Sequence, residues 1–226
     1  MVTHFGMEGL SLVSTPLAVK HSLSLSQSPK TEAEKRAYQD YAGYTPYLSL
    51  VGSLLFAIQT HPDIQFAVGL VAQFGSNPGI AHHEATKRIL CYLKETANYN
   101  LVLGRQREGK FDLIEWSDSN WAQDVDNQST SSFVFDVAGS SVTWSSKKQP
   151  TVVTSSVEAE YVTFTNAIKE AVWLCTLLFE LDFPSTTATV IFADNQGYIA
   201  LANNFVSYSC TKHIDICHYF IQEHIE

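Results

Sequence analysis

Three acidic residues lie at the ends or starts of predicted core elements, where carboxylates can bind a metal ion. Asp118 ends the segment FDLIEWSD, and Asp194 ends TVIFAD. Both segments are short and rich in β-branched and aromatic residues, which is typical of β-strands. Glu160 lies near the start of a long apolar segment between them. Taken singly, each acid is more simply a cap or a surface residue. Together, carboxylates from separate elements suit Mg²⁺, and two such ions can catalyse phosphodiester hydrolysis.

Helical spacing distinguishes Glu160 from its neighbour Glu158. From Glu160 the same helix face continues through an apolar stripe: Phe164, Ala167, Ala171, Leu174 and Leu178. From Glu158 it continues through Val162, Thr165 and Lys169, a mixed face that we expect to be wetter. We therefore predict that Glu160 points at the sheet, where a buried carboxylate needs a cation or a proton. Glu158 is then a first-turn acid that the helix dipole favours.

A second group of residues has the composition of a metal site. The segment SYSCTKHIDICHYF places Cys210, His213, Cys217 and His218 within nine positions. Thiolates and imidazoles at short spacing are the ligands that zinc prefers. His213 and Cys217 are four residues apart and share a helix face. A closed zinc site also needs four convergent ligands, which spacing alone does not establish.

Composition limits the class of protein. The chain has 226 residues, 45% of them hydrophobic, which is enough for one large domain or two modest ones. No apolar run approaches the ~20 residues of a membrane span, and MVTHFGMEGL lacks the features of a signal peptide. The four cysteines have no framework spacing, which indicates reduced thiols in a cytosolic or nuclear setting. The net charge of −9 is unfavourable for a nucleic-acid binder.

The N-terminal half is predicted to be helical after a linker. Residues 1–46 are rich in Ser, Thr and Pro and form a loop or linker, interrupted by the short polar helix TEAEKRAYQDY. Residues 47–105 are apolar, and Pro62 divides their first part into two helices. A third helix, HHEATKRILCYLKE, follows the turn at Asn77 and Pro78.

Residues 110–226 show the pattern of a mixed α/β domain. The segments FDLIEWSD, SSFVFDVAG and SVTWSS predict a three-stranded antiparallel meander. A long helix is expected over residues 157–181, and TVIFAD is apolar enough for a central strand. Further helices are predicted from Asn195 and over KHIDICHYFIQEHIE. The order β-β-β-α-β-α indicates one α/β fold.

Several long motifs resemble the ribonuclease H domain of copia-type retrotransposon polyproteins, in order and spacing. They are EWSDSNWAQDVDNQSTSSFVF, VTWSSKKQPTVVTSSVEAEY, FADNQGYIALANN and TKHIDICHYFIQEHIE. Upstream, FGMEGLSLVSTPL and YLSLVGSLLFAIQTHPDIQFAVGLVAQF resemble the end of that family's reverse transcriptase. The resemblance implies a ribonuclease H-like mixed sheet with flanking helices. A small helical thumb and connection segment of the reverse transcriptase would precede it.

The resemblance also implies a reaction, a cofactor and partners. The family's domain cleaves the RNA strand of RNA–DNA hybrids with carboxylates and Mg²⁺, for which Mn²⁺ can substitute. The matching residues are Asp118 in WSDSNWA, Glu160 in SVEAEY and Asp194 in ADNQ. Asn195 and Gln196 would contact the hybrid backbone or its 2′-hydroxyls, although helix capping explains them equally well. The expected partners are the hybrid and the rest of the Pol polyprotein, without a membrane.

Two parts of the family pattern do not occur in the sequence. The polymerase motif Tyr-x-Asp-Asp would lie upstream of residue 1, so we expect no reverse transcriptase activity. The family's fourth carboxylate lies in a Leu-Ala-Asp segment after a final strand, beyond Glu226, and Asp215 matches a capping position instead. We therefore expect weak or absent hybrid cleavage. The alternative is a non-catalytic remnant or a co-opted module that binds nucleic acid or protein.

The cysteines have a simpler explanation than zinc. The resembled family usually has arginine at six positions of this chain: His61, Cys91, Cys175, Cys210, Cys217 and Gln222. Each replacement is a single transition in an arginine CGN codon, the change that deamination of methylated cytosine produces. Six arginines would move the net charge from −9 to −3, since −9 + 6 = −3. We infer a decaying copy that has lost phosphate contacts rather than a new zinc site.

This interpretation predicts that the purified chain contains essentially no zinc. Elemental analysis after purification without chelators should give far less than one zinc ion per chain. One equivalent of zinc that is lost when Cys217 is changed to Ser would contradict the prediction and restore the cluster of Cys210 to His218 as a metal site.

Overall fold

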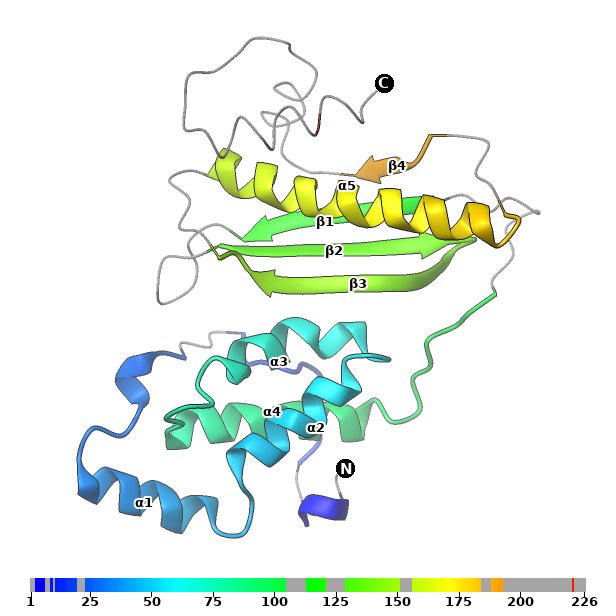
Figure 1. Ribbon diagram of the computed structural model, residues 1–226. Helices are drawn as coiled ribbons and strands as arrows, with labels where there is room; N and C mark the ends of the chain where they lie inside the picture. The colour runs from blue at the N-terminus through cyan, green and yellow to red at the C-terminus, as the bar shows by residue number, and fades with distance from the viewer. Residues whose placement is uncertain are drawn as a thin grey trace. The chain divides into compact units, whose positions relative to one another are not determined.

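The computed structural model describes two compact units, residues 1–101 and 102–226 (Figure 1). The described residues are 3–6, 9, 11–19, 23–104, 113–120, 129–150, 156–183, 188–192 and 221. The first unit is helical, and the second is α/β with a mixed sheet of four strands. The finer predicted boundaries, at residues 46, 105 and 110, remain predictions.

Four α-helices and three short 3-10 helices make up the described part of the first unit. They are η1 (Thr3–Phe5), η2 (Leu25–Gln27), α1 (Glu32–Ala42), α2 (Tyr47–Ala57), η3 (Pro62–Ile64), α3 (Gln65–Ala72) and α4 (Ile80–Glu95). Thr31 caps α1, because its hydroxyl accepts a hydrogen bond from the backbone N–H of Glu34 at 3.2 Å. Pro62 separates α2 from α3 and begins η3. The predicted polar helix, the division at Pro62 and the third helix are confirmed.

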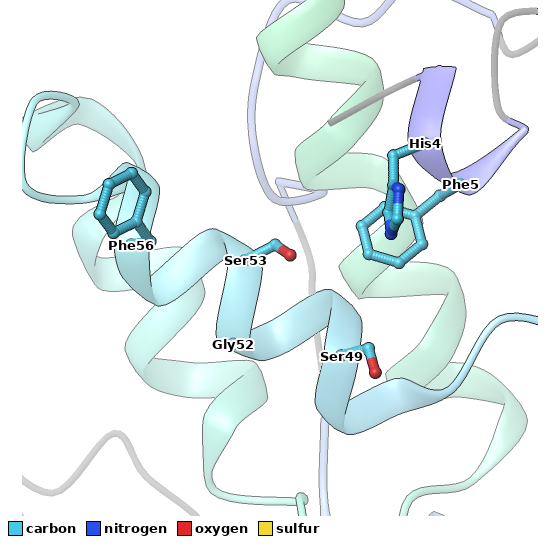
Figure 2. A pocket seen from close by; sticks show the side chains of 6 residues that line it. All are labelled: His4, Phe5, Ser49, Gly52, Ser53 and Phe56. Carbon is cyan, nitrogen blue, oxygen red and sulfur yellow. The ribbon is translucent and has the colours of Figure 1, made fainter.

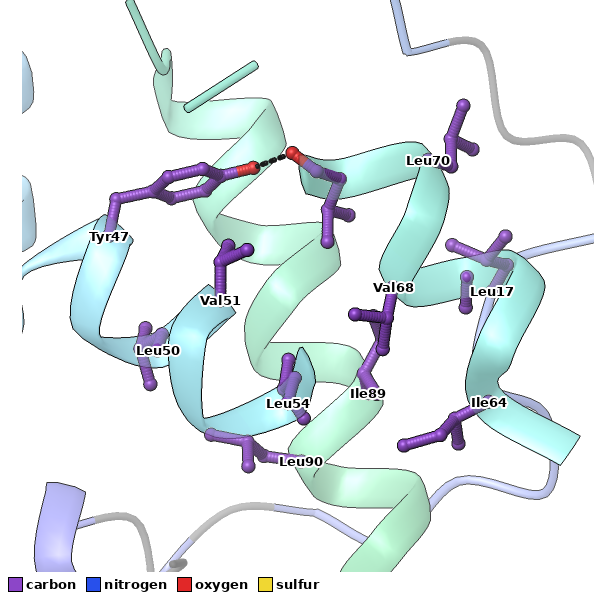
Figure 3. Close-up of a cluster of buried hydrophobic side chains, with 12 residues drawn as sticks. Leu17, Tyr47, Leu50, Val51, Leu54, Ile64, Val68, Leu70, Ile89 and Leu90 are labelled. Atoms are coloured by element: carbon purple, nitrogen blue, oxygen red, sulfur yellow. Dashed lines mark hydrogen bonds between the residues drawn. The ribbon is translucent and has the colours of Figure 1, made fainter. Parts of the chain in front are cut away.

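The core of the first unit lies between α2, α3 and α4 (Figure 3). Its fully buried aliphatic side chains are Leu50, Leu54, Ile64, Val68, Val71 and Ile89. Full burial of a side chain of this size stabilises a fold by about 1.5–3 kcal/mol. The hydroxyl of Tyr47 donates to the carbonyl of Val71 at 2.7 Å and so joins the start of α2 to the end of α3. Burial raises the pKa of Tyr47 to about 12.

A buried histidine at the start of α4, His82, holds a neighbouring segment in place. His82 stacks on Phe74 with ring centroids 3.9 Å apart. Its Nδ1 accepts from the backbone N–H of Gly79 at 2.9 Å, and its Nε2 donates to the carbonyl of Ser24 at 3.0 Å. A Cβ on Gly79 would collide with the carbonyl oxygen of Gln27, so only glycine allows this approach. The residues before α1 are therefore fixed against α4.

The sheet of the second unit has the strand order β3-β2-β1-β4. The strands are β1 (Leu113–Asn120), β2 (Thr130–Val137), β3 (Ser140–Lys148) and β4 (Val190–Phe192). β1, β2 and β3 are antiparallel neighbours, as predicted, and β4 is parallel to β1. Ala138 and Gly139, with φ of 53° and 75°, form the two-residue turn between β2 and β3.

β4 was expected to be a central strand, and the described sheet shows it at an edge. Val190 is 49% exposed and Phe192 is 50% exposed. Apolar composition signals a strand that can be covered on both faces, but strand order depends on which neighbours pair with it. Composition alone therefore did not place β4 correctly among the described strands.

Helix α5 (Ser156–Glu180) covers one face of this sheet (Figure 1). Ala171 and Leu174 of α5 pack on Leu113 of β1 and Phe135 of β2. The helix matches the predicted range within one residue at each end. Its residues 158–180 are also long and apolar enough to cross a membrane. A helix that packs on a sheet through an apolar stripe passes the same test, so we attribute this composition to the core.

We predict that acid destabilises the first unit through His83. This side chain is fully buried, and burial together with Lys87 lowers its pKa from 6.5 to about 4. Between these pH values the unfolded chain binds more protons than the folded chain. The contribution of neutral His83 to the free energy of unfolding is therefore complete above pH 6.5. About 2–3 kcal/mol of it is lost as the pH falls towards 4.

The pKa can be measured from the C2-proton resonance of His83, assigned by its absence in His83→Leu. The resonance should titrate below pH 5, and His83→Leu should flatten the acid limb of a urea-denaturation profile followed by circular dichroism. A midpoint near pH 6.5 would contradict the prediction.

Candidate active site

Strand register brings several polar residues to one end of the sheet. Asp118 of β1 pairs with Ser132 of β2, which pairs with Ser146 of β3. The hydroxyl groups of Ser132 and Ser146 are hydrogen-bonded at 3.1 Å. Two positions further towards the same end, Thr130 pairs with Lys148. The carboxyl end of β1 thus lies beside the start of β2 and the end of β3.

The start of α5 lies at this same end. Gln149 directly follows β3, and its amide nitrogen donates to Ser131 Oγ at 2.8 Å and to the carbonyl of Ala159 at 2.9 Å. Ser131 pairs with Ser119, the residue after Asp118. Figure 1 shows the first turns of α5 beside the head of the β1 arrow. The predicted site residues Asp118 and Glu160 are therefore at one end of the unit.

Asp118 lies on the sheet face opposite α5. Leu113 and Glu115 of β1 are buried on the helix side, whereas Trp116 and Asp118 are exposed. Side chains alternate along a strand, so Asp118 shares its face with Trp116, as predicted. Trp116 stacks on Phe192 of β4 with ring centroids 5.8 Å apart. The strand continues two residues beyond Asp118, so this acid precedes the strand end instead of forming it.

Glu160 has the environment that helical spacing predicted. It is 8% exposed, and Phe164, Ala167, Ala171 and Leu174 along its stripe are all buried. The prediction of a wetter position is wrong for Glu158 itself, which is 6% exposed, whereas Lys169 farther along the same face is exposed. Residues 158–161 are buried in succession, so this turn of α5 is covered on every side, although Ser156 before it is exposed. Helical spacing distinguishes buried from exposed faces only where a helix packs on one side. This turn is packed on several sides, so spacing could not separate Glu158 from Glu160.

The other predicted site residues lie outside the described residues. These are Asp194, Asn195 and Gln196, together with the cluster Cys210, His213, Cys217 and His218. Phe192, the last described residue of β4, pairs with Trp116 on β1. Asp194 comes two residues after Phe192 in the sequence, and Asp118 two residues after Trp116. Within the described ranges no group of three or more His, Cys, Asp or Glu side chains could hold a metal ion. The three-acid site remains a prediction.

The structure reveals one buried acid that the sequence analysis did not single out. Glu115 is fully buried beside Phe135, and neither of its carboxyl oxygens has a hydrogen-bond partner. Burial raises its pKa to about 8, an effect that nearby Ser117 opposes only in part. Glu115 is therefore mostly protonated at pH 7. Alternation from Leu113 could have identified it, because both residues belong to the helix-covered face of β1.

A hollow of about 570 Å³ in the first unit has no counterpart in the sequence predictions (Figure 2). It lies between η1 and α2 and is lined by His4, Phe5, Ser49, Gly52, Ser53 and Phe56. Its lining contains two hydroxyl groups and one imidazole and no carboxylate or lysine. We assign no chemistry to it.

The chain is similar along its whole length to retrotransposon proteins. It is 37% identical over 229 residues to the retrovirus-related Pol polyprotein from transposon TNT 1-94 of Nicotiana tabacum. It is 38% identical over 215 residues to that from transposon RE1 of Arabidopsis thaliana. These matches cover 100% and 95% of this chain but only 17% and 14% of the relatives, so the chain spans a small part of their length.

A shorter relative matches part of the chain. The secreted RxLR effector protein 161 of Plasmopara viticola is 45% identical over 131 residues, which are 57% of this chain and 91% of that protein. No protein-family model matches the chain. No solved structure is similar enough to be recognised.

We predict that Glu115 makes the second unit less stable as the pH rises. Its folded pKa of about 8 exceeds the ordinary value of 4.5, so the folded chain binds the extra proton between these values. The contribution of Glu115 to the free energy of unfolding is therefore highest below pH 4.5 and falls by about 3 kcal/mol between pH 4.5 and 7.5. Glu115→Leu should remove this slope and raise the free energy of unfolding at pH 7.5.

Urea denaturation followed by tryptophan fluorescence measures this effect, because all four tryptophans belong to residues 102–226. Glu115→Gln is the matched control. It cannot ionise and should also remove the slope, but it keeps a buried polar group and should be less stable than Glu115→Leu. An unchanged slope in both variants would show that Glu115 is not the titrating group.

Proposed function

The chain belongs to the family of retrovirus-related Pol polyproteins of copia-type retrotransposons, and we propose that residues 110–226 form a ribonuclease H-like domain. The proposed reaction is hydrolysis of the RNA strand of an RNA–DNA hybrid. Residues 47–105 are proposed to derive from the thumb and connection of a reverse transcriptase. The mixed sheet of four strands with a covering helix supports this assignment at the level of fold class.

One observation carries the proposal most directly. Two elements that bear proposed catalytic acids, β1 and α5, meet at one end of the sheet, and β4 runs towards that same end. Asp118 is near the carboxyl end of β1, and the first turn of α5 with Glu160 is tied to the same end through Gln149. β4 runs parallel to β1, and Phe192 is level with Trp116. In open sheets with parallel strands, sites form beyond the carboxyl ends of those strands.

The donor set fits a divalent cation. In the proposed site Asp118, Glu160 and Asp194 supply carboxylate oxygens, which are hard ligands suited to Mg²⁺ and also to Mn²⁺. Asp118 is exposed, so its carboxylate is open to a substrate phosphate. Glu160 is nearly buried, at 8% exposed, in the first two turns of α5. When bound, such ions activate a water molecule and stabilise the leaving oxygen.

The net charge of the chain implies that any hybrid cleavage is weak. Asn195 and Gln196 are proposed to contact the hybrid backbone or its 2′-hydroxyl groups. The chain carries a net charge of −9, so it repels a polyanionic substrate at long range. We therefore expect weak or absent cleavage with a shallow dependence on salt concentration, because few phosphate contacts release counterions. We expect no reverse transcriptase activity.

The second candidate function is a non-catalytic module that retains the fold. The same net charge favours it, because a nuclease for nucleic-acid hybrids normally benefits from a basic surface. Such a module could bind a protein or nucleic acid without cleaving it. The two candidates differ in whether the three acids are needed for a reaction.

We predict that the purified chain cleaves a labelled RNA–DNA hybrid slowly in the presence of Mg²⁺. Asp118→Asn, Glu160→Gln and Asp194→Asn should each reduce the rate at least a hundredfold, because each removes a proposed metal-binding charge. The measurement is single-turnover cleavage at low salt, resolved on a denaturing gel.

Asp136→Asn is a matched control for the loss of one negative charge. Asp136 is on β2, pairs with Ile114 and accepts a hydrogen bond from Ser141 at 2.7 Å, four residues away from Ser132 along the strand. This variant should cleave as fast as the unaltered chain. Cleavage that persists in all three acid variants would indicate a contaminating nuclease and favour the non-catalytic module.

A further inference from the structure

Gln149 is buried at the junction of three elements. It follows β3 directly, is 2% exposed, and directs its amide nitrogen at three oxygens. These are Ser131 Oγ on β2 at 2.8 Å, the carbonyl of Ala159 on α5 at 2.9 Å, and Thr163 Oγ1 on α5 at 3.3 Å. One side chain therefore joins the end of β3, the start of β2 and the first two turns of α5.

The network is closed by Thr163 and by the main chain. Thr163 Oγ1 lies 2.8 Å from Ser131 Oγ and 3.0 Å from the carbonyl of Ala159. The backbone N–H of Gln149 donates to the carbonyl of Ser129 at 2.7 Å. Because the carbonyl of Ala159 can only accept, the amide of Gln149 must present its nitrogen to it, which fixes the orientation of the amide. The amide oxygen of Gln149 has no hydrogen-bond partner.

This arrangement fixes the rotation of α5 about its own axis. Ala159 is the residue immediately before Glu160, and its carbonyl is held both by Thr163 and by Gln149. The carboxylate of a helical glutamate lies about 5–6 Å from the helix axis, so a rotation of the first turn by about 20° would move it by roughly 2 Å. The apolar stripe of α5 alone would permit such rocking, because hydrophobic contacts are not directional.

We propose that Gln149 is a positioning residue that holds the first turn of α5 so that Glu160 keeps one direction at the candidate active site. The inference rests on the proposed function for its catalytic consequence. Gln149 need not touch the substrate, because it acts through the carbonyl of Ala159. Loss of its amide should change how the site uses Mg²⁺ more than it changes the stability of the fold.

Gln149→Met tests the proposal, because methionine has a similar length and volume and lacks the donor. Leu174→Ala is the matched control, since Leu174 is 5% exposed and belongs to the core beneath the distal part of α5. Both variants are expected to lower the melting temperature of the 226-residue chain. All assays are run at equal distances below each melting temperature, so that the folded fractions match.

Two measurements separate positioning from general destabilisation. In hybrid cleavage, Gln149→Met should lower the single-turnover rate at least tenfold and raise the half-saturating Mg²⁺ concentration at least threefold, with little change in hybrid KM. Leu174→Ala should change each value less than twofold. In hydrogen exchange read by mass spectrometry, Gln149→Met should accelerate exchange selectively in residues 156–164, and Leu174→Ala in residues 170–180.

The outcomes also distinguish this inference from the proposed function. If the unaltered chain cleaves and both variants show the same rate and Mg²⁺ dependence, the inference is overturned and the proposed function stands. If the unaltered chain does not cleave, the proposed function fails, and the exchange data decide whether Gln149 holds the helix. Exchange in residues 156–164 that is no faster in Gln149→Met than in Leu174→Ala would overturn the inference by itself.

Discussion

The hydrogen bonds of Gln149 connect the end of β3 to β2 and to the first turn of α5. The proposed reaction depends on how these elements are positioned relative to one another. Without these hydrogen bonds, α5 would lie on the sheet through an apolar stripe that resists separation but not rotation. The amide of Gln149 supplies direction, because it contacts Ser131 of β2 and the carbonyl of Ala159 on α5 at the same time. Buried polar networks of this kind cost desolvation and are favourable only when their members are nearly all satisfied. In this protein the buried network of Gln149 costs desolvation and gives the start of α5 a defined position.

Two buried ionisable groups elsewhere, Glu115 and His83, show the opposite case. Glu115 has no partner for either carboxyl oxygen, so burial keeps it protonated at neutral pH and lowers the stability of the sheet. His82 is nearly satisfied, with an acceptor and a donor on opposite ring nitrogens and a stacked Phe74. His83, in contrast, has a buried Nε2 without a hydrogen-bond partner. These two groups are therefore expected to act in opposite directions: His83 disfavours the folded first unit as the pH falls, and Glu115 disfavours the folded second unit as the pH rises.

Much of the fold could be predicted from local pattern. Proline at residue 62, the apolar stripe from Glu160, and the turn residues between strands are all local signals, so α2 to α5 and the meander of β1 to β3 were located correctly. Errors arose where neighbours distant in the chain decide the environment. Glu158 is buried because its turn is covered on every side, and β4 is an edge strand of the described sheet because pairing sets strand order. Glu115 belongs to the helix-covered face of β1, whereas the sequence argument concerned only the opposite face, which carries Trp116 and Asp118.

The sequence by itself determined the family, the class of fold and which acids are candidates, because these depend on residue types and their order along the chain. Only the tertiary structure decided that Asp118 and the first turn of α5 lie at the same end of the sheet and that Asp118 faces away from the helix. Register, helix rotation and burial follow from contacts between residues far apart in sequence. Those contacts arise from packing and hydrogen bonding that no local pattern contains.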